Sequence, residues 1–324
     1  HPGRRSSRST TTSTTKTTTE VHVLEFDRAL AVGASGAVFG PVPDAVVGLH
    51  GPDARRFANG MFTNNVRDLA VGQWGRSFGL DDRGRIIMQI DVLCVGEQGF
   101  EVIVEGGADG FVERYEKFLL FDDVELTDRS GEHEVWTIQG VDARAIAAEA
   151  CAGRPWTQRS RSPWGGVDVL VRREAAEDLA DQLAAASRAT PAALDALRVL
   201  AGQPRWPRDI GPKRLPSELD VRGSHLSFDK GCYIGQESVN RIDVMGRVRR
   251  SLALIQVDGA PAADGAEVTS AEGEKAGAWT SGVALPSGGS AGLAVVRTPN
   301  HEVGRVVRVG GVPGRVVARP HLPG

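Results

Sequence analysis

The chain has 324 residues, 41% of them hydrophobic, with a formal net charge of -3 and a pI near 6.2. This length suggests about two domains with packed cores, and the charge gives no global attraction to nucleic acid. No apolar run approaches the roughly 18 to 20 residues that cross a bilayer, and no hydrophobic signal-peptide core is visible. We therefore expect a soluble protein that is not secreted, has no membrane partner and binds no nucleic acid directly.

Residues 1–20 are predicted to form a disordered tail. They contain four basic residues and a long Thr/Ser tract, and they have no apolar side chain beyond Pro2. Such a segment cannot bury enough surface to offset its ordering entropy. Its Arg/Ser-rich composition is also found in transit peptides, but the amphipathic apolar face of a transit peptide is missing. We expect a cytoplasmic protein, with the mitochondrial matrix as the alternative if residues 1–20 are a transit remnant.

The first half of the chain after this tail predicts an α+β unit. The expected elements are a strand at 46–49, a helix opened by Pro52 and Asp53 that ends near Gly60, strands at 85–95 and 98–105, and a helix at 111–120. The strands follow from alternating or continuous apolar residues, and the helices follow from apolar residues at helical spacing.

A second α+β unit follows, and its order resembles a ferredoxin-like split unit. Its expected elements are strands at 134–139 and 166–172 and helices at 142–151, 174–188 and 190–202. The remaining residues, 251–324, show no helical period, only short Val-rich runs broken by glycine. We expect strands of a small barrel at 250–257, 304–309 and 315–317.

Three cysteines are too few and too scattered for a disulfide framework, and no C-x-x-C pair is present, so a reducing compartment is expected. Cys94 lies in an alternating run typical of a strand core, and Cys151 closes an Ala-rich helix. Only Cys232 has a setting that suggests reactivity. The seven histidines show no metal-binding spacing, so no metal cluster is predicted.

Cys232 lies within the stretch D-K-G-C-Y-I-G-Q-E, residues 229–237. Gly231 and Gly235 flank the Cys-Tyr-Ile triplet and permit positive φ angles or a close backbone approach, which is typical of a loop. Lys230 and a helix start near Gln236 would both favour a thiolate at Cys232. A lone intracellular cysteine is, however, more often a small buried hydrophobic residue.

The whole nonapeptide resembles the signature K-G-C-Y-x-G-Q-E of the YgfZ-like family, the folate-binding relatives of the glycine cleavage system T-protein that support iron-sulfur proteins. Further segments resemble the family in the same order: 49–69, 80–92, L-P-S-E-L at 215–219 and A-G-A-W-T-S at 276–281. The resemblance implies two intertwined ferredoxin-like α+β units in residues 21–250, forming a T-protein-like folate-binding fold. A small C-terminal β-barrel in residues 251–324 would follow.

The resemblance also implies tetrahydrofolate as the cofactor. Amides would bond the pterin edge, a tyrosine would stack, and arginines such as Arg241 or Arg247 would pair with the glutamyl carboxylates. The expected folate-binding residues are Thr63, Asn64, Gln89, Arg198, Tyr233, Gln236 and Arg241. As alternatives, Asn64 and Asn65 are turn residues, and Arg247, Arg249 and Arg250 form the solvated face of a strand.

Two departures from the T-protein pattern bear on activity. Met88 and Gln89 stand where the T-protein has paired aspartates, one of them catalytic, and neither residue can replace a carboxylate. Leu200 stands where L-R-x-E-A-G supplies a glutamate to the pterin, and an unpaired buried donor costs about 1 to 3 kcal/mol. Classical aminomethyltransferase turnover is therefore not expected, and folate binding could be weaker, reoriented or lost.

The leading hypothesis is a folate-binding accessory factor for assembly or repair of iron-sulfur proteins, including tRNA-modifying enzymes. Its partners would be folate and iron-sulfur client or assembly proteins. The functional residues would be Cys232, with Lys230 favouring the thiolate and with Glu237 and Gln236 fixing the loop. The thiol would ligate iron transiently, exchange redox equivalents or attack a folate-borne one-carbon unit.

Two alternatives stay open at this point. The first is an aminomethyltransferase or folate-dependent demethylase of T-protein type, in which a carboxylate such as Asp91 or Glu237 replaces the missing aspartate. The second is a protein-binding adaptor with a vestigial folate site, which Leu200 favours.

Overall fold

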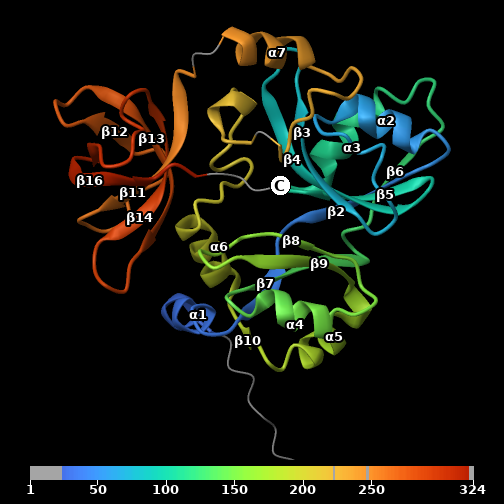
Figure 1. Cartoon of the computed structure of the whole chain (residues 1–324), viewed down its shortest axis with the longest axis horizontal. Coiled ribbons are helices and arrows are strands. Elements are labelled where there is room, and N and C mark those ends of the chain that lie inside the picture. Colours follow the sequence, from blue (N-terminus) through green and yellow to red (C-terminus); the bar gives the residue numbers. More distant parts are fainter. Residues whose placement is uncertain (1–23, 222, 246–247, 321–324) are drawn as a thin grey trace, which may run out of the picture.

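The computed structural model describes residues 24–221, 223–245 and 248–320. The predicted tail at 1–20 and Arg247 lie outside these residues. Figure 1 shows two α+β parts one above the other, with a barrel beside them. Within the described residues, no helix is both long and apolar enough to cross a membrane.

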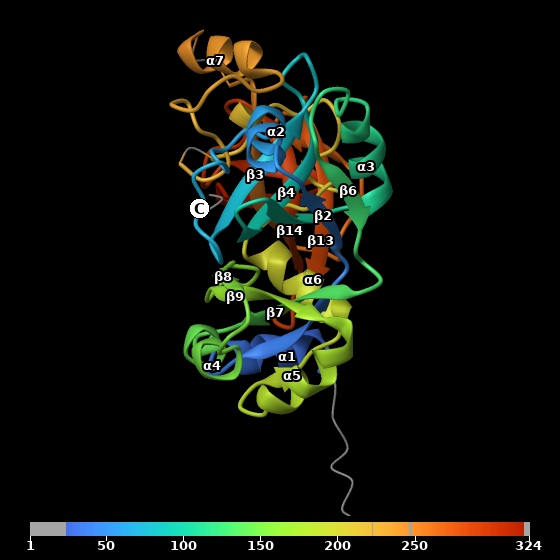
Figure 2. The same cartoon turned by 90° about the vertical axis from the view of Figure 1, so that its right-hand side faces the viewer.

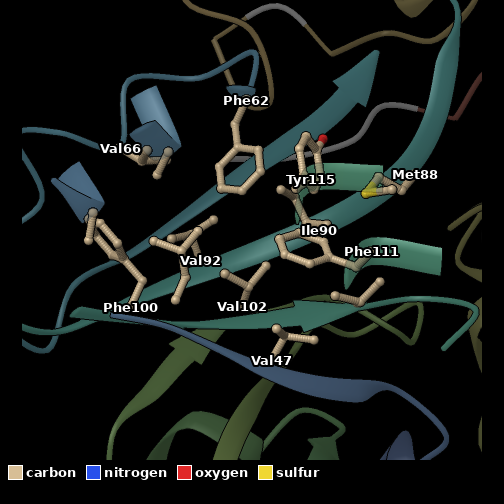
Figure 3. Close-up of a cluster of buried hydrophobic side chains, with 14 of the residues drawn as sticks. Val47, Phe62, Val66, Met88, Ile90, Val92, Phe100, Val102, Phe111 and Tyr115 are labelled. Atoms are coloured by element: carbon tan, nitrogen blue, oxygen red, sulfur yellow. The ribbon is translucent and has the colours of Figure 1, made fainter. Parts of the chain in front are cut away.

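The first α+β unit is a five-stranded sheet in the order β3-β4-β5-β2-β6. Its strands are β2 (Ala45–His50), β3 (Trp74–Leu80), β4 (Ile86–Gly96), β5 (Gly99–Val104) and β6 (Glu125–Asp128), and its helices are α2 (Ala54–Met61) and α3 (Ala108–Glu116). Both helices pack on one face of the sheet. There, alternate residues of β4 such as Met88 and Ile90 point toward Phe111 and Tyr115 of α3 (Figure 3).

The second unit is a five-stranded sheet in the order β10-β1-β7-β9-β8. Its strands are β1 (Val38–Val42), β7 (His133–Gln139), β8 (Trp156–Gln158), β9 (Gly166–Arg172) and β10 (Ser187–Arg188), and the helices near it are α1 (Phe26–Gly33), α4 (Ala143–Ala150), α5 (Ala176–Gln182) and α6 (Pro191–Leu200). Strands β1 and β2 follow one another in the chain but belong to different sheets. The two units are therefore intertwined, as predicted.

The C-terminal strands form a closed six-stranded barrel in the order β11-β14-β13-β12-β15-β16. They are β11 (Arg250–Val257), β12 (Glu267–Ser270), β13 (Lys275–Ala284), β14 (Ser290–Arg297), β15 (Val306–Val309) and β16 (Val312–Ala318). Trp279 is fully buried in the barrel core. A Cβ at Gly282 or Gly292 would lie 2.5 or 2.2 Å from its ring, so these glycines make room for it. The predicted small barrel is confirmed.

Most predicted elements lie where the pattern placed them, and two helices differ. The helix expected at 111–120 begins at Ala108 and ends at Glu116. The helix expected at 174–188 was wrong in its second half, because α5 ends at Gln182 after a 3-10 turn at Arg173–Ala175. Residues 187–188 instead form β10, which pairs with the edge of β1. Sheet pairing therefore overrides the local helical pattern here.

Candidate functional site

The signature loop, residues 229–237, leads into helix α7 (Gln236–Met245). This helix lies at one end of the first sheet, beside β3 and near α2 (Figures 1 and 2). The backbone N–H of Ile234 donates to the carbonyl of Gly60 at 3.3 Å, and that of Ser227 donates to the carbonyl of Thr63 at 3.1 Å. The loop is thus fixed to the chain at the end of α2.

Lys230 also holds the signature loop against the segment that follows α2. Its ammonium donates to the carbonyl oxygens of Phe62 at 2.5 Å and Asn64 at 2.8 Å, and it lies 5.0 Å from the ring centroid of Tyr233. Burial, with a smaller contribution from Arg67, lowers the pKa of Lys230 to about 7. Because both hydrogen bonds go to the segment after α2, the structure gives Lys230 a role in holding the loop.

Two glycines bring the loop against the β3–β4 turn. Gly235 has φ +82°, and a Cβ there would lie 2.6 Å from the carbonyl oxygen of Asp81 and 2.9 Å from the Cα of Gly84. Gly84 has φ +73°, and its own Cβ would lie 2.9 Å from Ser238. Only glycine satisfies both the left-handed backbone and the close approach. The segment around Gly84 and the signature loop therefore pack directly against each other.

The anchored loop presents Cys232 to solvent. Glu237 and Arg241, both on α7, are also exposed, whereas Gln236 is half-buried and its N–H donates to the Tyr233 carbonyl at 3.2 Å. Cys94 is buried, as predicted, and Cys151, at the C-terminal end of α4, is buried as well. The accessible thiol is therefore that of the signature loop.

Met88 and Gln89, at the positions of the missing aspartates, point in opposite directions. Met88 belongs to the core beneath α2 and α3, whereas Gln89 pairs across the strands with Phe78 and faces the other side of the sheet. The Gln89 Nε2 donates to Glu105 at 3.2 Å, and its Oε1 is buried without a partner among the described residues. Both side chains are buried, and only Gln89 keeps a polar group, on the sheet face opposite α2 and α3.

Two more buried polar atoms near Phe78 lack a partner within the described part of the chain. The ring of His225 stacks on Phe78 with 4.7 Å between centroids, and its Nε2 is unpaired. Tyr233 packs in the same apolar cluster as Phe78, and its hydroxyl is also unpaired. Burial lowers the pKa of His225 well below its usual value, so the ring is neutral. These two atoms and the Gln89 Oε1 are therefore buried polar atoms with unused hydrogen-bonding capacity.

Two residues expected to bind folate use their polar groups within the protein. The Thr63 hydroxyl donates to the His225 carbonyl at 2.6 Å and accepts from the Phe78 N–H at 2.9 Å. The Asn64 amide donates to the carbonyls of Arg76 at 2.9 Å and Ser224 at 2.7 Å. Both side chains join the segment after α2 to the chain before the signature loop.

Arg198 likewise has protein partners, Asp195 and Asp209, each at 2.7 Å. Asp209 is buried and also accepts hydrogen bonds from the hydroxyls of Thr280 and Ser281, both at 2.5 Å. The segment at 276–281 is therefore tied to α6 through the Asp209 carboxylate and through a direct hydrogen bond from Arg198 to the Ser281 hydroxyl at 3.3 Å.

A buried ion network joins the two sheets. Arg159 binds both carboxylate oxygens of Asp91 at 2.8 and 2.7 Å, and it binds Glu105 at 3.0 Å. The other members of the network are Asp44, Arg76, Asp168, Arg161 and Arg205. Burial, and next the nearby Asp44, raise the pKa of Glu105. Because Arg159 occupies both oxygens of Asp91, this carboxylate is poorly placed to replace the missing catalytic aspartate.

Sequence reasoning missed His225, Glu105 and Arg159. Each is a single polar residue outside any recognised spacing. The contacts of His225 with Phe78, and of Arg159 with Asp91 and Glu105, join distant parts of the chain. No signal in the sequence alone identifies them.

Residues 44–173 match the family model described as the GCVT N-terminal domain. An aminomethyltransferase of Rubrobacter xylanophilus is 27% identical over 300 residues, covering 85% of this chain and 80% of the relative. The tRNA-modifying protein YgfZ of Cronobacter sakazakii is 26% identical, covering 64% of this chain and 67% of the relative. The mitochondrial iron-sulfur cluster assembly factor IBA57 of Homo sapiens is 26% identical, covering 82% and 78%.

The fold is also similar to a solved structure. The glycine cleavage system aminomethyltransferase T from Bartonella henselae superposes with a TM-score of 0.78 at 20% identity. The match covers 90% of this chain and 88% of that one. At this identity the likeness shows a shared fold.

Proposed function

We propose that the chain belongs to the YgfZ-like family related to the glycine cleavage T-protein, because its similarity to an aminomethyltransferase, YgfZ and IBA57 spans most of its length, and that it is a folate-binding accessory factor for iron-sulfur proteins. It assists their assembly or repair, tRNA-modifying enzymes among them, and it acts through Cys232. The observation that carries this proposal is the exposed thiol on a loop fixed by Lys230 and by the contact of Gly84 with Gly235.

In this proposal the thiol of Cys232 supplies one ligand to iron, and the iron is delivered to the partner protein. Ordinary iron-sulfur clusters take four thiolates, so the remaining ligands come from the partner protein. The anchored loop holds Cys232 in a defined place before the partner arrives, which lowers the ordering cost of docking. The other two roles considered for the Cys232 thiol are redox exchange and attack on a one-carbon unit. Both depend less on a thiol that is exposed to a partner protein.

Tetrahydrofolate is the proposed cofactor, and Gln89, His225 and Tyr233 would hold its pterin. Bound tetrahydrofolate supplies a carrier of one-carbon units. The amide oxygen of Gln89 accepts a hydrogen bond, and the neutral His225 ring and the Tyr233 hydroxyl offer further polar contacts. Exposed Arg241 is available to a glutamyl carboxylate.

We expect tetrahydrofolate to bind the wild-type chain and to bind Leu200→Glu more tightly, because the resemblance to L-R-x-E-A-G implies a pterin-binding glutamate at this position. Calorimetric titration measures both affinities. At 100 times its dissociation constant the ligand adds about 2.7 kcal/mol to the free energy of unfolding. Absence of binding to both proteins would remove folate from the proposal and favour the adaptor.

The function itself is tested in a host that lacks its own relative of this chain. We expect iron-sulfur enzymes, tRNA-modifying enzymes among them, to lose activity in this host and to regain it when the wild-type chain is expressed. Unchanged enzyme activities in the deletion host would refute the accessory role. Release of formaldehyde or methylene-folate from a methylamine donor by the purified chain would instead establish the aminomethyltransferase or demethylase alternative.

A further inference from the structure

Two large apolar side chains are at least 80% exposed on the segment between α3 and β6, residues 117–124. Leu120 is 80% exposed and Phe121 is 93% exposed. Scattered exposed apolar residues are normal on protein surfaces, but two adjacent ones at the tip of a connection indicate a contact site. The proposed folate and thiol chemistry does not use them.

The base of this segment is fixed on both sides of the exposed pair. On the N-terminal side, Leu119 packs against the core of the first unit. On the C-terminal side, the Asp123 N–H donates to the Asp53 carboxylate at 3.0 Å, and Asp122 pairs with Arg56 at 2.7 Å. Since both flanks are held, Leu120 and Phe121 are presented outward in a defined arrangement.

The surface around the pair is acidic. Residues 113–129, with the contacting Asp53 and Arg56, contain the acids Asp53, Glu113, Glu116, Asp122, Asp123, Glu125 and Asp128, and the bases Arg56, Arg114, Lys117 and Arg129. This excess of negative charge repels phosphates of nucleic acids and anionic lipid surfaces. It favours a partner whose contact surface is basic.

The apolar pair is also too small to support a stable homodimer. Specific, stable interfaces bury about 1,200 to 2,000 Å² in total, far more than two side chains contribute. A small apolar anchor with a charged rim is instead suited to a transient contact.

We propose that Leu120 and Phe121 insert into an apolar pocket, rimmed by lysine and arginine, on a folded partner protein. Resting on the proposed function, this partner is the iron-sulfur client or assembly protein that Cys232 serves. The pair positions the partner and takes no part in the chemistry.

The test places a photo-crosslinking phenylalanine analogue at position 121 of the full chain, in the host described above. The control places it at position 71, where Val71 is 63% exposed elsewhere on the surface. We expect position 121 to crosslink to an iron-sulfur protein at a peptide beside a basic-rimmed apolar pocket. Crosslinks no stronger than those from position 71, or only to lipid or to other copies of the chain, would overturn the proposal.

A second measurement uses the purified crosslinked partner and the double variant Leu120→Ser/Phe121→Ser. The affinity is expected to fall at least about tenfold relative to wild type, as for loss of central anchor residues, and to weaken with added salt. Val71→Ser is the matched control and should bind as wild type. An unchanged affinity of the double variant would overturn the anchor.

The two proposals fail separately. If the deletion host keeps its iron-sulfur enzymes active, the proposed function fails whatever position 121 contacts. If the enzymes depend on the chain but the double variant restores them fully and binds normally, the anchor fails and the function stands.

Discussion

Replacing Arg159 by alanine is expected to lower the free energy of unfolding by about 3 to 5 kcal/mol. The guanidinium is buried and binds Asp91 through two hydrogen bonds and Glu105 through a third. Its removal leaves two carboxylates inside the protein without their main countercharge. Urea unfolding of wild type and Arg159→Ala measures the difference.

Arg173→Ala is the control for this prediction. Arg173 pairs with Glu134 at 2.6 Å, but its side chain is 57% exposed. An ion pair of this kind contributes about 0 to 1 kcal/mol. Equal losses from the two variants would show that the buried network does not join the sheets as the geometry indicates.

Gly235→Ala is expected to displace the signature loop and to abolish support of iron-sulfur enzymes in the deletion host. Alanine at φ +82° is strained by about 1 to 3 kcal/mol. Its Cβ would also lie 2.6 Å from the Asp81 carbonyl oxygen, so the loop must move away from the β3–β4 turn. Enzyme activities in cells and the free energy of unfolding measure the two effects.

Gly231, in the same loop, provides the matched control for Gly235→Ala. A Cβ at Gly231 would meet no atom within 4 Å, and its φ lies outside the left-handed region. Gly231→Ala should therefore keep both stability and function, although it lies beside Cys232. A Gly235→Ala protein with wild-type activity would mean that the position of the loop does not matter.

The local elements could be predicted from sequence where one pattern dominated. Strand β9 and strand β11 begin and end as expected because their apolar runs are bounded by turn residues or glycine. The helix at 174–188 was predicted too long, since its last residues pair with β1 across the sheet. Pairing between distant segments leaves no local trace in the sequence.

The candidate site was predicted in part. The signature motif located the loop and its cysteine. Because Lys230 and Cys232 are close in sequence, we expected Lys230 to act on the thiol. Its hydrogen bonds go instead to the carbonyls of Phe62 and Asn64. Likewise Thr63 and Asn64 were expected at the pterin, and their polar groups bind the protein itself. Motifs identify which residues matter together, and only tertiary contacts show what each one touches.

The most direct test of the central claim is the activity of an iron-sulfur enzyme in cells whose only copy of this chain is Cys232→Ser. Because the thiol is exposed, the variant should accumulate and unfold as wild type does. We predict that enzyme activity stays at the level of the deletion host, although the protein is folded and present. Full restoration of activity by Cys232→Ser would contradict any mechanism in which this thiol takes part.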